Sequence, residues 1–229
     1  MSLQEKINAT VALLKRVEKD YSPATLASSL GAEDMVLTDL VAKHAPGISI
    51  FSLDTGRLNP ETYDLLAKVQ ATYGDKVALK VLYPEAQVIQ LFVEKNGINA
   101  FYDSVENRKA CCGIRKVEPL NRALKGHKAW ITGMRRSQSA DRANLAFEEN
   151  DADHGMTKFN PLADWSEKDV WEYIRGNAIP YNELHDKHYP SIGCAPCTRS
   201  IAVGEDVRAG RWWWEDESMK ECGLHVKKI

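Results

Sequence analysis

The chain has 229 residues and a mass of 25.7 kDa, the size of one ordinary domain. Its composition, 44% hydrophobic and 27% charged, is typical of a globular chain that buries a sizeable core. The net charge of -2 argues against a general nucleic-acid binder. Because the apolar runs are strand-length and the first 20 residues are rich in charge, neither a membrane-spanning helix nor a signal peptide is predicted, and a cytoplasmic location is expected.

Apolar periodicity predicts alternating strands and helices up to residue 133. The predicted helices span 3–19, 32–44, 60–73, 85–95 and 108–124, and the predicted strands span 24–30, 48–53, 77–83 and 129–133. A further helix is expected from Ser166 to Ile174, because Ser166 and Asp169 have the spacing of a capping box. This alternation predicts an α/β fold with a mainly parallel twisted sheet covered by helices on both faces, in a single domain of residues 1–229.

Ligands of such sheets bind beyond the carboxyl ends of the strands, so the loops at 28–34, 54–58 and 133–139 are expected to converge. In the 28–34 loop, Gly31 and two serines would let backbone N–H groups approach an anion. A simple tight turn is the alternative, because neither the P-loop nor the Rossmann fingerprint is present. Asp54, at a strand end, is expected either to accept hydrogen bonds from a nucleotide or to shape its own turn.

The five cysteines fall into two tight pairs and one lone residue. Cys111 and Cys112 are adjacent, Cys194 and Cys197 form a C-x-x-C, and Cys222 lies near the end of the chain. The two pairs could supply four thiolates to one zinc ion or one iron–sulfur cluster, and their spacing does not choose between these. A thioredoxin-like redox motif is the weaker alternative, because no predicted strand precedes the C-x-x-C.

The end of the chain combines cations, tryptophans and the lone cysteine. Arg208 and Arg211 have a spacing that suits a divalent anion, and three tryptophans follow at 212–214. Nearby cations would lower the pKa of the Cys222 thiol and so raise its thiolate fraction. Further basic residues lie on or after elements at the presumed ligand-binding edge, and the set suggests a polyanionic small ligand: Arg115, Lys116, Arg135, Arg136 and Arg142.

Together, the cysteine set, the Arg208-x-x-Arg211-Trp-Trp-Trp run and the terminal Glu221-Cys-Gly-Leu-His225 resemble the sulfonucleotide reductase family, in particular the assimilatory adenylyl-sulfate (APS) reductases of bacteria. The resemblance spans about residues 27–225 and includes the motifs Leu53-Asp-Thr-Gly56, Gly133-Met-Arg-Arg136 and Asn160-Pro-Leu-Ala-Asp-Trp-Ser166. It implies an adenine-nucleotide α-hydrolase-like fold. It also implies a thioredoxin-dependent oxidoreductase of sulfate assimilation, which reduces APS to sulfite and AMP through an S-sulfocysteine intermediate.

Roles are implied only where a position of this chain matches the family. Cys111, Cys112, Cys194 and Cys197 would hold a [4Fe-4S] cluster, and Cys222 would be the nucleophile. The implied phosphosulfate contacts are Lys116, Arg142, Arg208 and Arg211, with His225 beside the bound substrate. The implied nucleotide contacts are Ser28, Ser29, Gly31, Asp54, Gly133 and Arg136. Leu30 departs from the family pattern, because related loops often have a small polar residue there.

The resemblance also concerns partners and chain organisation. Residues from about 205 to 229 are expected to form a mobile catalytic tail. A thioredoxin or a glutaredoxin-like protein is expected as electron donor, because the chain lacks the glutaredoxin-like domain of the plant enzymes. No nucleic-acid or membrane partner is expected, and formation of a homo-oligomer stays open.

Three other interpretations compete with an APS reductase. A phosphoadenylyl-sulfate (PAPS) reductase would use the same fold and nucleophile, but such relatives generally lack the four cluster cysteines. A PP-loop ATP pyrophosphatase or tRNA-thiolating enzyme should carry a Ser-Gly-Gly-x-Asp-Ser loop, which this chain lacks. A non-catalytic metal or redox sensor would leave the paired arginines and the Cys222 motif unexplained.

Overall fold

The structure is a computed structural model that describes residues 1–139 and 142–216. The chain divides into two compact units whose segments interleave along the sequence. The first unit contains residues 1–52, 61–80 and 126–182, and the second contains 53–60, 81–125 and the chain from 183 onward. The prediction of a single domain stays a prediction, and the two units are described separately.

The sheet has six strands in the order β3-β2-β1-β4-β6-β5. Strands β1 (Ala24–Ala27), β2 (Ser49–Leu53), β3 (Leu79–Leu82) and β4 (Ala129–Ile131) were expected from the sequence, and each is shorter than predicted, β2 by one residue. β1 pairs in parallel with β2 and β4, and β4 pairs in parallel with β6 (Met156–Phe159). The prediction of a mainly parallel sheet is therefore confirmed.

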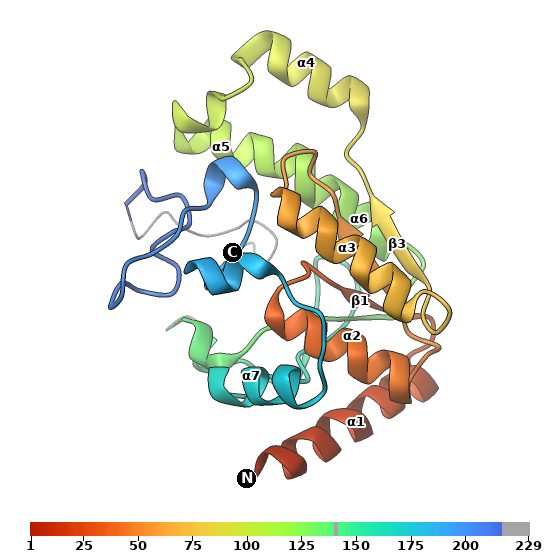
Figure 1. Cartoon of the computed structure of the whole chain (residues 1–229). Coiled ribbons are helices and arrows are strands. Elements are labelled where there is room, and N and C mark those ends of the chain that lie inside the picture. The colour runs from red at the N-terminus through yellow and green to blue at the C-terminus, as the bar shows by residue number, and fades with distance from the viewer. Residues whose placement is uncertain (140–141, 217–229) are drawn as a thin grey trace. The chain divides into compact units, whose positions relative to one another are not determined.

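Four helices belong mainly to the first unit. They are α1 (Leu3–Asp20), α2 (Ala32–His44), α3 (Pro60–Tyr73) and α7 (Glu167–Gly176), all close to the predicted bounds. The Ser166 hydroxyl accepts a hydrogen bond from the Asp169 N–H, so the predicted capping box at the start of α7 is confirmed. Figure 1 shows α1, α2 and α7 lying close together, consistent with their shared hydrophobic core.

The core of the first unit forms where these helices meet the strands. Its most deeply buried large side chains are Trp165, Phe159, Leu14, Leu26, Met35, Leu37, Leu40, Ile48 and Ile50. The Asp39 carboxylate is buried beside the core and accepts hydrogen bonds from the hydroxyls of Tyr73 and Tyr173. Because burial and this carboxylate disfavour the phenolate, the pKa values of both tyrosines rise above their ordinary value.

A hairpin at the sheet edge was not expected from the sequence. β5 (Glu148–Asp151) pairs antiparallel with β6, and β5 is the outermost strand on that side. The four residues of β5 are Glu, Glu, Asn and Asp, none of which favours a strand. Periodicity could not indicate this strand, because it contains no apolar residue.

The second unit contains α4 (Ala86–Asn96), α5 (Val105–Cys112) and α6 (Glu118–Leu124), with a π-helical segment at Gly113–Val117 between the last two. The helix predicted for 108–124 therefore begins three residues earlier than expected and contains a π-helical segment that was not predicted, whereas its end at Leu124 is confirmed. Short 3-10 helices lie at Ala100–Tyr102, Glu183–Lys187 and Ala195–Cys197. In the first unit, a 3-10 turn at Arg136–Gln138 follows β4.

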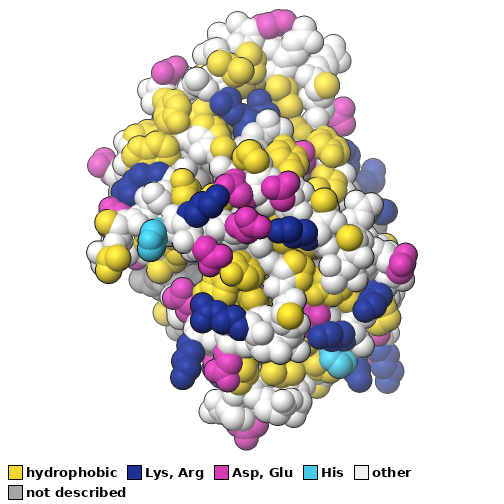
Figure 2. Space-filling model, viewed as in Figure 1, with side chains coloured by type: hydrophobic (Ala, Val, Ile, Leu, Met, Phe, Trp, Pro, Cys, Tyr) yellow, Lys and Arg dark blue, Asp and Glu magenta, His cyan; other side chains and the backbone are white. Residues whose placement is uncertain are grey.

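Charged side chains of both signs are interspersed on the face shown in Figure 2. This distribution agrees with the small net charge. Among the described residues, no helix is both long enough and apolar enough to cross a membrane.

Candidate functional site

The loop between β1 and α2 is closed by its own side chains. The Ser28 N–H donates to the Phe51 carbonyl in β2, and the Ser28 hydroxyl accepts from the Leu30 N–H. Leu30 is buried and has a positive φ of 61°, a conformation that few non-glycine residues adopt. Gly31 is the N-cap of α2, and no side chain caps this helix start. The first-turn N–H groups of α2 therefore lie at the end of this loop.

Asp34 ties this loop to the turn after β4. Its carboxylate accepts hydrogen bonds from the Ser29 N–H and the Ser29 hydroxyl, both at 2.7 Å, and from the backbone N–H of Gly133. Burial raises the pKa of this carboxyl to about 6, against the opposing effect of these hydrogen bonds. A Cβ atom at Gly133 would lie 2.4 Å from Asp34 Oδ1, so only glycine permits this close approach. Two of the three loops expected to converge therefore do so.

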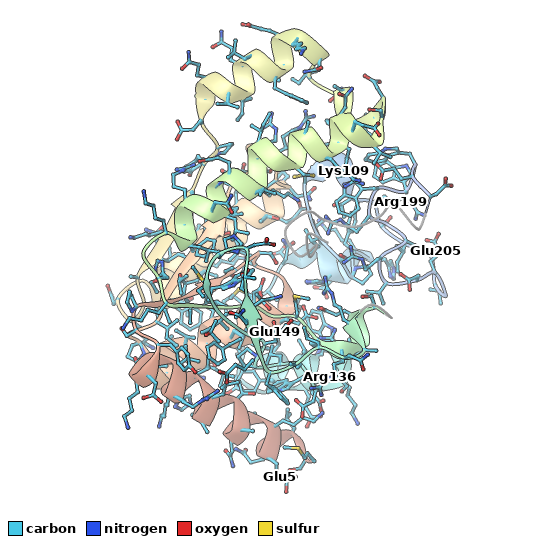
Figure 3. The ribbon with its side chains drawn as sticks, turned by 180° about the vertical axis from the view of Figure 1, so that it is seen from behind. Glu5, Lys109, Arg136, Glu149, Arg199 and Glu205 are labelled. Carbon is cyan, nitrogen blue, oxygen red and sulfur yellow. The ribbon has the colours of Figure 1, made fainter. Side chains whose placement is uncertain are left out.

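The arginines after Gly133 have different partners. Arg135 is buried and forms an ion pair with Glu33, with a separation of 2.7 Å between Nη2 and Oε1. Arg136 donates to the Leu145 carbonyl at 2.8 Å and lies 5.1 Å from the centre of the Phe147 ring. Arg136 is labelled in Figure 3, as is Glu149 of the edge strand β5. Arg142 is half-buried and donates to the side-chain oxygen of Gln138. Nucleotide or phosphosulfate contacts of Arg136 and Arg142 stay predictions.

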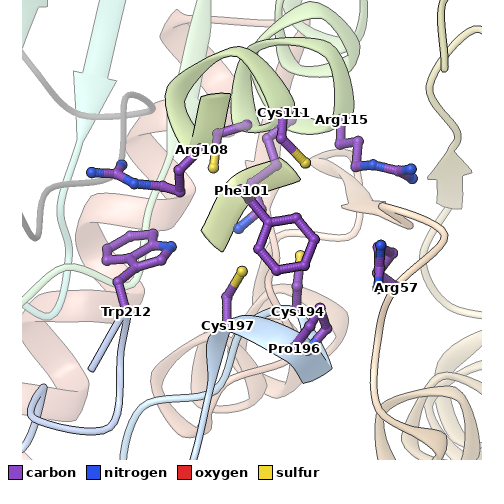
Figure 4. Close-up of a pocket in the computed structure, with 11 residues that line it drawn as sticks. Arg57, Phe101, Arg108, Cys111, Arg115, Cys194, Pro196, Cys197 and Trp212 are labelled. Atoms are coloured by element: carbon purple, nitrogen blue, oxygen red, sulfur yellow. The ribbon is translucent and has the colours of Figure 1, made fainter. Parts of the chain in front are cut away.

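In the second unit, all four paired cysteines line one pocket. The other residues that line it are Arg57, Phe101, Arg108, Arg115, Lys116, Pro196 and Trp212. Cys111 and Cys112 come from the end of α5, whereas Cys194 is the N-cap and Cys197 the last residue of the 3-10 helix Ala195–Cys197. In Figure 4 the side chains of Cys111, Cys194 and Cys197 point toward the same space beside Phe101. Residues some eighty positions apart in the sequence thus meet in one place.

The π-helical segment contributes two pocket cations, Arg115 and Lys116. It directly follows Cys112, the last residue of α5. Arg115 is buried and donates to the Thr55 carbonyl at 2.6 Å, which fixes its position in the pocket wall. Such π turns are rare within helices and often lie at functional sites, because they change the direction of the side chains that follow.

The four thiols experience different electrostatic environments. Burial raises the pKa of the Cys111 thiol. For Cys197, burial and the negative charge of a nearby Cys194 thiolate both act to raise the pKa, to about 12. Burial also opposes ionisation of Cys194, yet the pKa of this thiol is lowered, because Lys116, Arg211 and a 3.2 Å hydrogen bond with Thr55 favour the thiolate. Cys194 is therefore better prepared than Cys111 or Cys197 to act as an anionic ligand.

Asp54 lies in the loop of this unit that carries Thr55. Its carboxylate accepts a hydrogen bond from the Gly56 N–H at 2.7 Å, and its side chain is buried. Gly56 has a φ of 70°, which glycine adopts without strain. Asp54 therefore has the turn-shaping role that the sequence allowed, and its nucleotide contact stays a prediction.

The segment with the paired arginines packs beside the cysteine pocket. The backbone N–H of Trp212 donates to the Cys197 carbonyl. The guanidinium groups of Arg108 and Arg211 each lie 4.7 Å from the centre of the Trp212 ring. Arg108 is almost fully buried and pairs with Glu215 at 2.7 Å. The Arg208 N–H donates to Asp206. The tryptophan run is thus docked within its unit rather than frayed.

Four cysteines in one pocket are a donor set of the kind that binds a metal centre. Among the residues described, no three His, Cys, Asp or Glu side chains are placed to hold a single metal ion. A single zinc ion requires all its sulfur ligands about 2.3 Å from one point. A polynuclear iron–sulfur cluster spreads its cysteine ligands further apart, because each thiolate binds a different iron atom. The residues present therefore fit such a cluster.

Two predicted residues, Cys222 and His225, lie outside the described part of the chain. Sequence reasoning assigned no role to several residues that the structure places at these sites: Glu33, Asp34, Thr55, Arg108, Gln138 and Trp212. Glu33, Asp34 and Thr55 stand within motifs that the sequence singled out. No signal links Gln138 to Glu33, because their contact spans about a hundred residues.

A family model described as "Phosphoadenosine phosphosulfate reductase domain" matches residues 23–200. The chain belongs to this family. The relatives named adenosine 5'-phosphosulfate reductase include one from Allochromatium vinosum, 54% identical over 96% of this chain and 86% of the relative. Another, from Burkholderia cepacia, is 50% identical over 99% of this chain and 90% of the relative.

Solved structures agree with this family assignment. A PAPS reductase from Candida auris superposes with a TM-score of 0.72 at 29% identity, over 87% of this chain and 96% of that one. An FMN adenylyltransferase from Candida glabrata shares the fold with a TM-score of 0.60 at 16% identity, over 96% of this chain and 77% of that one. The family member described here thus has the α/β fold that the sequence predicted.

Proposed function

We propose that this chain is an oxidoreductase of sulfate assimilation that reduces adenylyl sulfate to sulfite and AMP. The observation that carries the proposal is the pocket lined by two cysteine pairs and by the cations Arg115 and Lys116. It occurs in a chain about half identical, over nearly its whole length, to proteins named for this reaction. An α/β sheet with a loop at the start of α2 supports a nucleotide substrate.

The proposed cofactor is a [4Fe-4S] cluster held by Cys111, Cys112, Cys194 and Cys197. The pocket cations and the lowered pKa of Cys194 support it, because cysteines bind metal as thiolates. When bound, the cluster would supply a rigid centre and a local electrostatic field. These cysteines are free thiols in the structure, which supports work in a reducing compartment such as the cytoplasm.

The proposed anion contacts are Lys116, Arg142, Arg208, Arg211 and His225, with Ser28, Ser29, Gly31, Asp54, Gly133 and Arg136 around the nucleotide. Fixed cations near the phosphosulfate would stabilise the negative charge that builds up as AMP departs. Lys116 lines the cysteine pocket itself, which supports a position near the sulfate. Losing one such contact typically costs about a hundredfold in rate.

The reaction requires one nucleophile on the enzyme and one external dithiol. The Cys222 thiolate would attack the sulfur of APS, the bond between this sulfur and the bridging oxygen breaks, and AMP leaves with the electron pair. The S-sulfocysteine formed at Cys222 is then attacked at Sγ by a thiolate of the donor, which expels sulfite and leaves a mixed disulfide. The second thiol of the donor resolves this disulfide, so the donor supplies both electrons.

Partner and chain organisation follow the same proposal. A thioredoxin or glutaredoxin-like protein is the proposed donor, because Cys222 has no second cysteine nearby in the sequence. The 229 residues would act as one sulfonucleotide reductase domain, whose last part, from about residue 205, carries the nucleophile. The alternative substrate is PAPS, which the family description and the Candida auris structure both favour.

A test compares sulfite release from APS and from PAPS with thioredoxin present. Sulfite from APS is expected, and release from PAPS alone would favour the alternative. In a second arm, APS carrying radioactive sulfate is added without reductant, and the label should become covalently bound to the wild-type chain but not to Cys222→Ser. A wild-type chain that never acquires label would contradict the proposed mechanism. Iron and sulfide analysis of the anaerobically purified protein tests the cluster.

A further inference from the structure

The side-chain amide of Gln138 forms hydrogen bonds with two side chains and with one backbone N–H group. Its Nε2 group donates to Glu33 Oε1 at 3.0 Å, and its Oε1 atom accepts from the Arg135 N–H at 3.0 Å and from Arg142. Glu33 lies in the first turn of α2, directly after the 28–31 loop. Gln138 thus connects Arg142, a proposed phosphosulfate contact, to the start of the helix that follows the proposed nucleotide loop.

The orientation of the Gln138 amide follows from these partners. Its oxygen lies toward two donors and its nitrogen toward a carboxylate. A flipped amide would set NH2 against a guanidinium and oxygen against a carboxylate, and would lose all three contacts. The network therefore fixes the amide, and the amide in turn fixes one face of the Arg142 guanidinium.

Arg135 and Arg142 differ in the groups that contact their guanidinium groups. Arg135 is buried and bonded to Glu33, the Ser137 hydroxyl and the Trp165 carbonyl, so its fixed role is to hold this region together. One of the contacts of the Arg142 guanidinium is with the neutral amide oxygen of Gln138. A neutral partner orients a guanidinium without adding a negative charge beside the anion that this guanidinium would bind.

We propose that Gln138 is the positioning residue of Arg142, and that it orients this guanidinium for the sulfated end of the substrate. The inference rests on the proposed function, in which Arg142 contacts the phosphosulfate. Gln138 itself touches no substrate in this proposal and acts through Arg142. It therefore contributes to discrimination between APS and AMP, which lacks the sulfate.

The experiment is a double-mutant cycle on the cluster-containing enzyme. The KM and kcat for APS and the inhibition constant of AMP are measured for wild type, Gln138→Ala, Arg142→Ala and the double variant. Gln138→Ala is expected to raise the KM for APS about tenfold, because one hydrogen bond to a charged group is lost. The AMP constant should change less than twofold, and the double variant should be no worse than Arg142→Ala alone.

Two further variants sharpen the test. Gln138→Glu places a carboxylate next to Glu33 and beside the bound anion, so it should raise the KM for APS more than Gln138→Ala does, again with little effect on AMP. Gln90→Ala is the control, because Gln90 is exposed and bonds to Glu94 of its own helix. This control should match wild type in every constant.

The possible results separate this inference from the proposed function. A parallel weakening of APS and AMP would mean that Gln138 only supports the loop, and independent, additive losses would remove the coupling to Arg142; either result overturns the inference. A wild-type level of activity in Arg142→Ala would overturn it too, while the reductase activity itself stands. Failure of the wild-type enzyme to release sulfite from APS would instead overturn the proposed function.

Discussion

At Gly133 two chain segments of the first unit approach each other closely. In Gly133→Ala the new methyl group would lie 2.4 Å from Asp34 Oδ1 and 2.9 Å from Glu33 Cβ, so the two segments must move apart. We expect a loss of about 1–3 kcal/mol in the free energy of unfolding, measured by urea denaturation. Gly176→Ala is the matched control, because a Cβ there meets nothing within 4 Å. Equal stabilities of the two variants would contradict the prediction.

Asp34 gives the stability of the protein a specific pH dependence. Burial raises the pKa of its carboxyl from an ordinary 3.8 to about 6, so between these pH values the folded chain holds a proton that the unfolded chain has lost. The contribution of this group to stability therefore falls as the pH rises from 4 to 7. Relative to Asp34→Asn, the wild type should lose about 3 kcal/mol over this range.

The measurement for Asp34 is the free energy of unfolding of both proteins at pH 4, 5, 6 and 7. Asp75→Asn, a change at an exposed position, serves as control and should follow the wild type at every pH. A constant difference between the wild type and Asp34→Asn across the range would show that the carboxyl titrates alike in the folded and unfolded chains.

Among the elements, α5 depends on a buried ion pair with the segment that follows the paired arginines. Arg108 and Glu215 are both almost fully buried and contact each other at 2.7 Å. Glu215→Gln removes the carboxylate from a buried guanidinium, which should cost about 3 kcal/mol. Denaturant unfolding followed by tryptophan fluorescence reports on this region, because Trp212 stacks against Arg108.

A matched pair on the surface provides the comparison for Arg108 and Glu215. Arg199 and Glu205, labelled in Figure 3, contact each other at 2.9 Å, and each is more than a third exposed. Glu205→Gln should cost less than about 1 kcal/mol, because solvent screens this pair. The double variant Arg108→Met with Glu215→Leu should be more stable than Glu215→Gln alone. Equal costs at the two pairs would show that burial of the ion pair has no energetic consequence.

At the scale of the whole molecule, the proposed iron–sulfur cluster should stabilise one unit more than the other. All four cysteines lie in the second unit, and the first has its own hydrophobic core. Removal of iron by a chelator should therefore increase hydrogen exchange at residues 105–117 and 194–215 by at least tenfold. Exchange in β1 and α2 should change little. A uniform increase along the chain, or no increase anywhere, would contradict this prediction.

Local chemistry in the sequence predicted much of the fold. The helix Leu3–Asp20 was predicted almost to the residue, because its apolar spacing is regular along its whole length. The first strand was predicted too long, because its apolar run continues to Leu30, which is buried in a loop with left-handed backbone. The π-helical segment at Gly113–Val117 was not predicted, because a π turn changes the hydrogen-bond pattern without a change in amino-acid composition.

The candidate site was predictable where motifs are compact in the sequence. The cysteine pairs were expected to share one centre, and they line one pocket. Partners that lie far apart in the chain were not predictable. Glu33 and Gln138 are ordinary polar residues until the fold brings them within 3.0 Å of each other. Thr55 stands in a recognised motif, but nothing in that motif indicates its contact with Cys194, which is 139 residues away in the sequence.

The acidic strand β5 limits how copies of the chain can associate. It occupies one border of the sheet, where an unpaired backbone would otherwise invite another strand. If a second copy continued the sheet there, Glu148, Glu149 and Asp151 of one chain would lie against the same carboxylates of the other. Like charges across this edge would disfavour continuation of the sheet, in proportion to the charge that Arg16 and Lys158, the partners of Glu148 and Glu149, leave unneutralised.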